Sequence, residues 1–167
     1  MSEPGREKKR KGAARGLIYD KGVKQMNALE GKDLDLIVWP EGGYPYYFPN
    51  ALVTEESREK KLRGKGYAGK LQKMVKERAT HFVFGALTKP ADGGKLRNTF
   101  IQLTPEGTFE EIHVKRILVP FGEFLPFRNY LKFMENISGN IDFTSGQNNR
   151  LISNSDINIL PIICYEI

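Results

Sequence analysis

Apolar positions along the chain gather in short runs that alternate with polar stretches rich in glycine and proline. Strand-like runs of apolar and β-branched residues lie at 33–39, 81–88, 98–103, 109–114, 151–153 and 157–164. Turns at 90–94 and 105–107 connect the second, third and fourth runs, which predicts three strands in meander order. Pro40 is expected to stop the first strand and to leave Glu41 just past its carboxyl end, where α/β folds commonly bind ligands.

Helical spacing is found in two parts of the chain. Residues 16–32 are expected to be partly helical. Residues 54–79 place apolar side chains at helical intervals, although three glycines weaken the first half of this segment. Residues 115–126 hold two prolines and a glycine among large apolar side chains, which favours an ordered loop, and a short helix is expected over residues 127–137.

The composition is that of one globular domain. The chain has 167 residues, of which 40% are hydrophobic, enough for one substantial core. Its single cysteine, Cys164, excludes an internal disulfide framework and a cysteine-rich zinc site. No run of about 18 apolar residues is present, so no segment is expected to span a bilayer by itself.

Positive charge is unevenly distributed. The formal net charge is +6, and residues 3–15 carry six basic and two acidic side chains, while residues 56–78 carry nine basic and three acidic ones. Residues 1–15 lack the apolar segment of a secretory signal and are interpreted as a basic disordered tail. The basic stretches are interpreted first as solvated faces. An anionic lipid surface stays open as a partner, whereas no recognition module supports nucleic acid.

Three side chains are candidates for chemistry. Cys164 follows an apolar run, where it is either a packed thiol or a nucleophile. Glu41 is placed to act as a base, and Lys115 to hold positive charge against a developing oxyanion. Taken singly, each of the three is more often a structural or surface residue than a functional one.

Three of four sequence motifs contain these candidates, and together the four motifs resemble one family. They are Leu36–Glu41 with Pro45, His113–Pro126, Asp142–Gly146 and Pro161–Ile167. In this order and at this spacing they resemble the nitrilase (carbon-nitrogen hydrolase) superfamily, and within it the apolipoprotein N-acyltransferase family of bacteria. The resemblance covers residues 34–167.

The resemblance implies a role for each candidate. Glu41 corresponds to the general base, Lys115 to the lysine that stabilises the tetrahedral oxyanion, and Cys164 to the attacking nucleophile. The family also relies on three supporting residues, which correspond here to Glu123, Tyr165 and Glu166. No cofactor is implied. No metal is expected either, because the two histidines are isolated from any carboxylates at ligand spacing.

The same resemblance implies an α/β fold, a nitrilase-like α-β-β-α sandwich, incomplete at both ends, with the partial domain over residues 16–167. The expected reaction moves an acyl chain from a phospholipid donor, through a thioester on Cys164, to the N-terminal amine of a diacylated lipoprotein acceptor. Nucleic acid is not an expected partner. The family places this domain on the periplasmic side of the bacterial inner membrane, and membrane association would come from segments absent from this chain.

Two departures from the family pattern keep alternatives open. The chain has no membrane span and stops three residues after Cys164, so this fragment by itself is expected to have little or no activity. A thioester trapped on Cys164 of the isolated chain would contradict that expectation. The alternatives are a soluble nitrilase-like amidase acting on a small amide or nitrile, an inactive truncated product, and a non-enzymatic basic module that binds anionic membranes or nucleic acid through residues 6–15 and 58–78.

Overall fold

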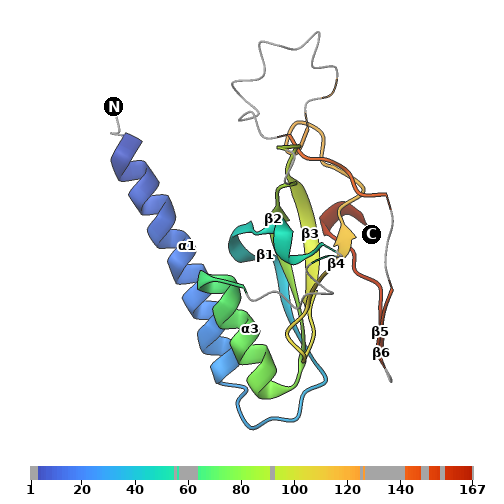
Figure 1. Ribbon diagram of the computed structural model, residues 1–167. Helices are drawn as coiled ribbons and strands as arrows, with labels where there is room; N and C mark the ends of the chain where they lie inside the picture. The colour runs from blue at the N-terminus through green and yellow to red at the C-terminus, as the bar shows by residue number, and fades with distance from the viewer. Residues whose placement is uncertain are drawn as a thin grey trace.

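In the computed structural model, two helices cover one face of a four-stranded sheet, and the C-terminal segment lies against the other face (Figure 1). The structure describes residues 4–54, 56, 64–90, 93–124, 126, 142–147, 151–154 and 157–166. The described elements are α1 (Pro4–Asn27), β1 (Leu36–Phe48), the 3-10 helix η1 (Asn50–Leu52), α3 (Gly66–Arg78), β2 (His81–Thr88), β3 (Arg97–Leu103), β4 (Phe109–Val114), β5 (Ile152–Asn154), β6 (Ile157–Ile159) and the 3-10 helix η3 (Cys164–Glu166).

The sheet has the strand order β1-β2-β3-β4. Strands β1 and β2 are parallel and are connected through α3, as parallel neighbours require a crossover. Strands β2, β3 and β4 pair antiparallel in sequence order, which confirms the predicted meander and the α/β class. The short strands β5 and β6 pair only with each other.

An aromatic core fills the space between the helices and the sheet. Trp39 of β1 contacts Phe82 of β2 edge to face, with ring centroids 5.1 Å apart. Gly22 allows α1 to approach this layer closely, because a Cβ at Gly22 would lie 2.6 Å from the Trp39 ring. The Tyr19 hydroxyl of α1 donates to the Tyr67 carbonyl of α3 at 2.9 Å and so joins the two helices. We call this side of the sheet the helix face.

The opposite side, which we call the far face, has a smaller apolar cluster. Val83 and Ile112 are buried there, and Leu36, Phe100 and Ile159 pack against them. Because side chains alternate between the two faces of a strand, polar residues two positions from these apolar ones also point to the far face.

The structure differs from the sequence-based expectations at several elements, of which α1 and β1 come first. Helix α1 begins at Pro4, inside the segment 1–15 interpreted as a disordered tail, and its many lysines, arginines and alanines are good helix formers. Strand β1 does not stop at Pro40 but continues to Phe48 through an irregularity in its register. The helix expected over residues 127–137 lies outside the described residues. Among the described helices, none combines the length and apolar character needed to cross a membrane.

Candidate active site

Glu41 lies on a bulge in the middle of β1. The register with β2 pairs Trp39 with Phe84 and resumes only at Tyr44, opposite Ala86. The residues between leave the regular ladder, and a proline such as Pro40 is tolerated at a bulge because it has no amide proton to donate. The predicted strand end is therefore wrong, but the bulge still separates Glu41 from the regular strand.

Two glycines make room for this bulge. Gly42 has a φ of +68°, in the left-handed region that favours glycine. Gly85 of β2 lies directly beside the bulge, where a Cβ would be 2.6 Å from the Cα of Glu41 and 2.8 Å from the carbonyl oxygen of Pro40. The backbone position of Glu41 thus depends on the absence of a side chain on the neighbouring strand.

Asn98 of β3 connects Glu41 with Lys115. Its side-chain amide donates to Oε1 of Glu41 at 2.6 Å. Its backbone carbonyl accepts a hydrogen bond from the Lys115 amide at 2.8 Å. Asn98 is 4% exposed and lies two positions before Phe100, so its side chain points to the far face. A single buried residue therefore fixes both the base candidate and the backbone of the lysine candidate.

Lys115 follows directly after β4 and is 1% exposed. Its ammonium group donates to Oε1 of Glu123 at 2.9 Å and lies equally close to Oε2. Glu123 is held in turn by the amide of Val119, which donates to Oε2 at 2.9 Å. A buried ammonium is tolerated only when it is paired, so the contact with Glu123 offsets the cost of burying Lys115 and fixes its orientation.

The Asp142–Gly146 segment makes backbone hydrogen bonds to both Lys115 and Glu123. The amide of Gly146 donates to the Lys115 carbonyl, and the amide of Phe143 donates to the Glu123 carbonyl, both at 2.9 Å. These contacts explain why this segment accompanies the lysine block in the sequence.

Cys164 is exposed and begins η3. Strand β6 ends at Ile159, so the expected strand from Ile157 to Cys164 is too long, and the cysteine lies on a turn. Its φ is +54°, a conformation rare for a residue with a side chain. Strain of this kind is often kept at functional sites. The neighbouring Tyr165 is 70% exposed.

Glu166 joins the cysteine turn to the loop after β4. Its Oε2 accepts hydrogen bonds from Nε2 of His113 at 2.6 Å and from the amide of Ile163 at 2.7 Å. Its Oε1 accepts from the amides of Arg116 at 2.5 Å and Ile117 at 3.4 Å. Burial alone would raise the pKa of Glu166, but these donors outweigh burial and hold the pKa below its ordinary value.

The candidate residues thus form two linked groups. Glu41 and Lys115 are connected through Asn98, and the Cys164 turn is tied through Glu166 to the residue that follows Lys115. Within the described part of the chain, no hydrogen bond or ion pair joins Glu41, Lys115 and Cys164 directly.

Sequence reasoning missed Asn98 and His113. Both are buried polar residues on strands, at 4% and 1% exposure. Asn98 lies two positions before Phe100 on its strand, and this spacing could have indicated an inward-facing polar side chain. His113 has Glu111 and Lys115 at the same spacing, so alternation gives no such signal for it.

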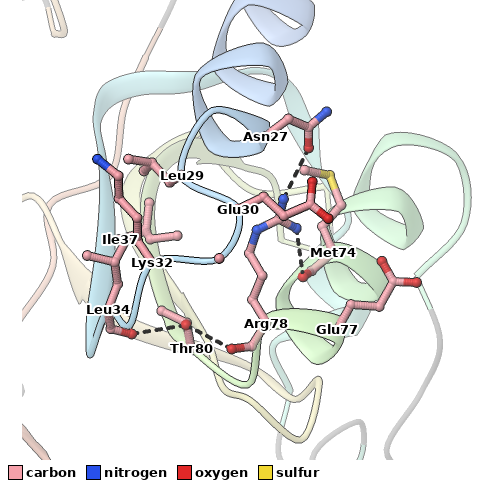
Figure 2. Close-up of a pocket in the computed structure, with 11 residues that line it drawn as sticks. Asn27, Leu29, Glu30, Lys32, Leu34, Ile37, Met74, Glu77, Arg78 and Thr80 are labelled. Atoms are coloured by element: carbon pink, nitrogen blue, oxygen red, sulfur yellow. Dashed lines mark hydrogen bonds between the residues drawn. The ribbon is translucent and has the colours of Figure 1, made fainter.

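Among the described residues, neither a metal-binding cluster nor the cavity drawn in Figure 2 involves the candidate residues. Among the described residues, no group of three or more histidine, cysteine, aspartate or glutamate side chains is placed to hold a metal ion. A cavity of about 450 Å³ lies where β1 and β2 begin, at the other end of these strands from the Glu41 bulge (Figure 2). Arg78 crosses it and donates to the Met74 carbonyl and to Oδ1 of Asn27, both at 3.2 Å. None of the candidate residues lines this cavity.

Residues 12–167 match the family model described as carbon-nitrogen hydrolase. An apolipoprotein N-acyltransferase from Brucella suis is 32% identical over 168 residues, which cover 92% of this chain and 28% of the relative. The enzyme of the same name from Geobacter metallireducens is 30% identical over 135 residues, which cover 79% of this chain and 23% of that protein. The chain therefore spans about a quarter of the length of these curated relatives.

Solved structures of low sequence identity share the fold. A CN-hydrolase superfamily protein from Xanthomonas campestris, solved with an arsenic adduct in its active site, is 16% identical with a TM-score of 0.57, over 90% of this chain and 48% of that protein. A glutamine-dependent NAD+ synthetase from Acinetobacter baumannii is 19% identical with a TM-score of 0.54, over 90% of this chain and 25% of that protein. These similarities confirm the expected nitrilase-like fold class.

Proposed function

Because the chain belongs to the carbon-nitrogen hydrolase family, we propose that it provides the catalytic residues Glu41, Lys115 and Cys164 of a lipoprotein N-acyltransferase. The acyl donor is a membrane phospholipid, and the acceptor is the N-terminal amine of a diacylglyceryl-cysteine lipoprotein. The curated relatives at about 30% identity carry this activity in their name, which supports the choice of reaction. The reaction takes place at the periplasmic face of the bacterial inner membrane.

The observation that carries the proposal is the pair of links through Asn98 and Glu166. One connects the base candidate to the lysine candidate, and the other connects the cysteine turn to the residue after the lysine. Positions far apart in sequence are thereby held on one face of the sheet. A carboxylate, an ammonium and an exposed thiol in one neighbourhood suit acyl transfer through a thioester.

In the first half-reaction, Glu41 takes the proton from the thiol of Cys164, and the sulfur attacks the ester carbonyl carbon of the phospholipid. The carbonyl oxygen becomes an oxyanion, which Lys115 and the backbone amide of Tyr165 stabilise. When the tetrahedral intermediate collapses, the carbon–oxygen bond breaks, and the lysophospholipid leaves with the proton from Glu41. The acyl chain remains on Cys164 as a thioester.

In the second half-reaction, the amine of the lipoprotein attacks the thioester carbonyl, and Glu41 accepts a proton from the attacking nitrogen. The carbon–sulfur bond breaks, an amide forms, and Cys164 regains its proton. Lys115 serves both steps, since an ammonium group has three N–H donors and the two contacts to Glu123 leave one for the oxyanion.

A chimera tests this function, because the chain spans only 28% of the Brucella suis relative. Residues 12–167 replace the matching segment of that protein. The purified chimera receives phospholipid with a labelled acyl chain together with a diacylated lipopeptide, and in separate reactions small amides. We expect label on the lipopeptide. Ammonia release from small amides without acyl transfer would contradict the acyltransferase and support the amidase.

Substitutions assign the roles in the same assay. Cys164→Ala should abolish transfer, and Glu41→Gln and Lys115→Met should each lower kcat by about 10²-fold or more. Lys73→Met is the matched control, because this side chain is 77% exposed on α3. If Lys115→Met behaved like Lys73→Met, the role of Lys115 in oxyanion stabilisation would be excluded.

A further inference from the structure

We propose that His113 is a positioning residue for the nucleophile turn, acting through the carboxylate of Glu166. The role in catalysis rests on the proposed function above, whereas the role in holding the turn does not. His113 was expected to be an isolated histidine, and the structure places it between the two halves of the candidate site.

Through the Glu166 carboxylate, the His113 side chain is linked by hydrogen bonds to both the cysteine turn and the loop after β4. Nε2 of His113 lies 2.6 Å from Oε2 of Glu166, and the same oxygen accepts from the amide of Ile163, the residue before Cys164. The other oxygen accepts from the amide of Arg116, the residue after Lys115. The position of one carboxylate therefore determines how the peptide before the nucleophile lies relative to the peptide after the lysine.

The partners of His113 show which ring nitrogen donates a hydrogen bond. The side chain has 0% exposure, and Nε2 faces a carboxylate, so Nε2 carries the proton. Nδ1 is buried and has no hydrogen-bond partner among the described residues. The Nε2–H group therefore donates the one hydrogen bond that the His113 ring makes there, to the Glu166 carboxylate.

Removal of this donor should loosen the turn. The Glu166 side chain is only 6% exposed, so its carboxylate depends on protein donors rather than on water. Without Nε2–H, Oε2 keeps one donor, and the carboxylate is free to rotate away from Ile163. The Cys164 backbone, at a φ of +54°, then loses the contact that holds it in an unfavourable conformation.

Three variants separate the hydrogen bond from the packing of the ring. His113→Gln places an amide N–H near the position of Nε2 and keeps the donor. His113→Asn places its amide near Nδ1 and loses the contact, and His113→Phe keeps a ring without any donor. His81→Phe is the matched control, because His81 is hydrogen-bonded to Gln102 at the start of β2, where the strand lies away from the Glu41 bulge.

Amide hydrogen exchange, followed by NMR on the chain itself, measures how firmly the cysteine turn is held. It does not require enzymatic activity. In His113→Phe and His113→Asn, exchange at Ile163 and Arg116 should accelerate about tenfold or more, while amides in the middle of β2 and β3 stay unchanged. His113→Gln and His81→Phe should leave Ile163 and Arg116 protected. Uniform acceleration of all amides, or unchanged exchange at Ile163 in His113→Phe, would overturn the proposal.

Two further measurements complete the test. In the chimera, His113→Phe and His113→Asn should lower kcat about 10²-fold with little change in KM, and His113→Gln should restore most of it. A full kcat in His113→Phe overturns the catalytic role while the acyltransferase stands. If the unsubstituted chimera transfers no acyl chain, the proposed function fails, and the exchange data alone decide the positioning of the turn. Nitrogen-15 shifts of the His113 ring should show the Nε2–H tautomer, and an Nδ1–H tautomer would refute the assignment.

Discussion

At the scale of single residues, Asn98 links two of the candidate residues, Glu41 and Lys115. Replacing it with aspartate keeps the size of the side chain but turns the donor to Glu41 into a second carboxylate at a separation of 2.6 Å. Like charges at this distance repel, and the pair holds one proton to higher pH than a single carboxyl does.

Asn98→Asp should therefore lower kcat for acyl transfer in the chimera by about 10²-fold and move the acidic limb of the pH–rate profile to higher pH. The base is available only after that shared proton has left. Gln25→Glu introduces the same charge on the exposed side of α1 and should leave the profile unchanged. A profile for Asn98→Asp identical to that of the unsubstituted protein would show that Asn98 does not position Glu41.

The sequence predicted the candidates that carry family motifs and missed those that act through distant contacts. Glu41, Lys115 and Cys164 each lie in a block of several neighbouring residues, so local sequence identifies them. Asn98 contacts a residue 57 positions away, and His113 contacts one 53 positions away. Alternation along β3 could indicate that Asn98 faces inward, but no periodicity or short motif identifies its partner or that of His113, because tertiary folding alone creates these contacts.

At the scale of secondary structure, the fit between β1 and β2 decides where Glu41 lies. A Cβ on Gly85 would come 2.6 Å from the Cα of Glu41. Neither atom can rotate away, because the backbone fixes the position of both. Gly85→Ala should lower the free energy of unfolding by about 1–3 kcal/mol, as overpacking does, and displace the bulge. The measurement is urea unfolding, together with acyl transfer in the chimera.

Gly12→Ala is the control for the glycine change. Gly12 lies in α1, and a methyl group added there would have no neighbouring atom within 4 Å, so alanine should be neutral or stabilise by up to about 1 kcal/mol. Equal stability of Gly85→Ala and Gly12→Ala would mean that β2 can move to accept the methyl group, contrary to the close approach described.

The connection between β4 and the cysteine turn should depend on pH. The pKa of Glu166 is lowered in the folded chain below its ordinary 4.5, so its hydrogen bonds stabilise the fold above that pH and are lost on acidification. The free energy of unfolding should therefore decrease between about pH 5 and pH 3. In Glu166→Gln this contribution is missing, so the decrease should be shallower, as measured by urea unfolding at each pH. An equally steep decrease in both proteins would contradict the assignment.

The regular elements were predictable to different degrees. The meander β2-β3-β4 was predicted because alternating runs and turns lie close together in sequence. The continuation of β1 past Pro40 was not, because the bulge depends on Gly85, more than forty positions away. Helix α1 was placed too late since its basic first half has helix propensity but no apolar periodicity.

At the scale of the whole molecule, the basic first half of α1 and the candidate site lie on different parts of the structure. The first half of α1 extends beyond the sheet in Figure 1, and residues 11–15 are exposed. Glu41, Asn98 and Glu166 belong to the far face and its loops. The hypothesis of a basic binding module and the acyltransferase hypothesis therefore assign function to separable segments.

Deletion of residues 1–11 tests this separation. It removes five basic and two acidic residues, and leaves Tyr19 and Met26 as the buried anchors of α1. The free energy of unfolding should change by less than about 0.5 kcal/mol, because the buried anchors of α1 remain in place. Binding to anionic phospholipid vesicles at low salt should weaken, since that attraction depends on net positive charge and is screened by salt.

Cys164→Ala should have the opposite effect, with unchanged vesicle binding and no acyl transfer in the chimera. If the deletion unfolded the chain, the first half of α1 would be part of the core. The basic residues of this segment could then not be removed without loss of the fold. If Cys164→Ala retained transfer in the chimera, which already lacks residues 1–11, the thiol would not be the nucleophile. The exposed thiol on a strained turn, tied by Glu166 to the peptide after a buried and paired lysine, argues for the opposite assignment.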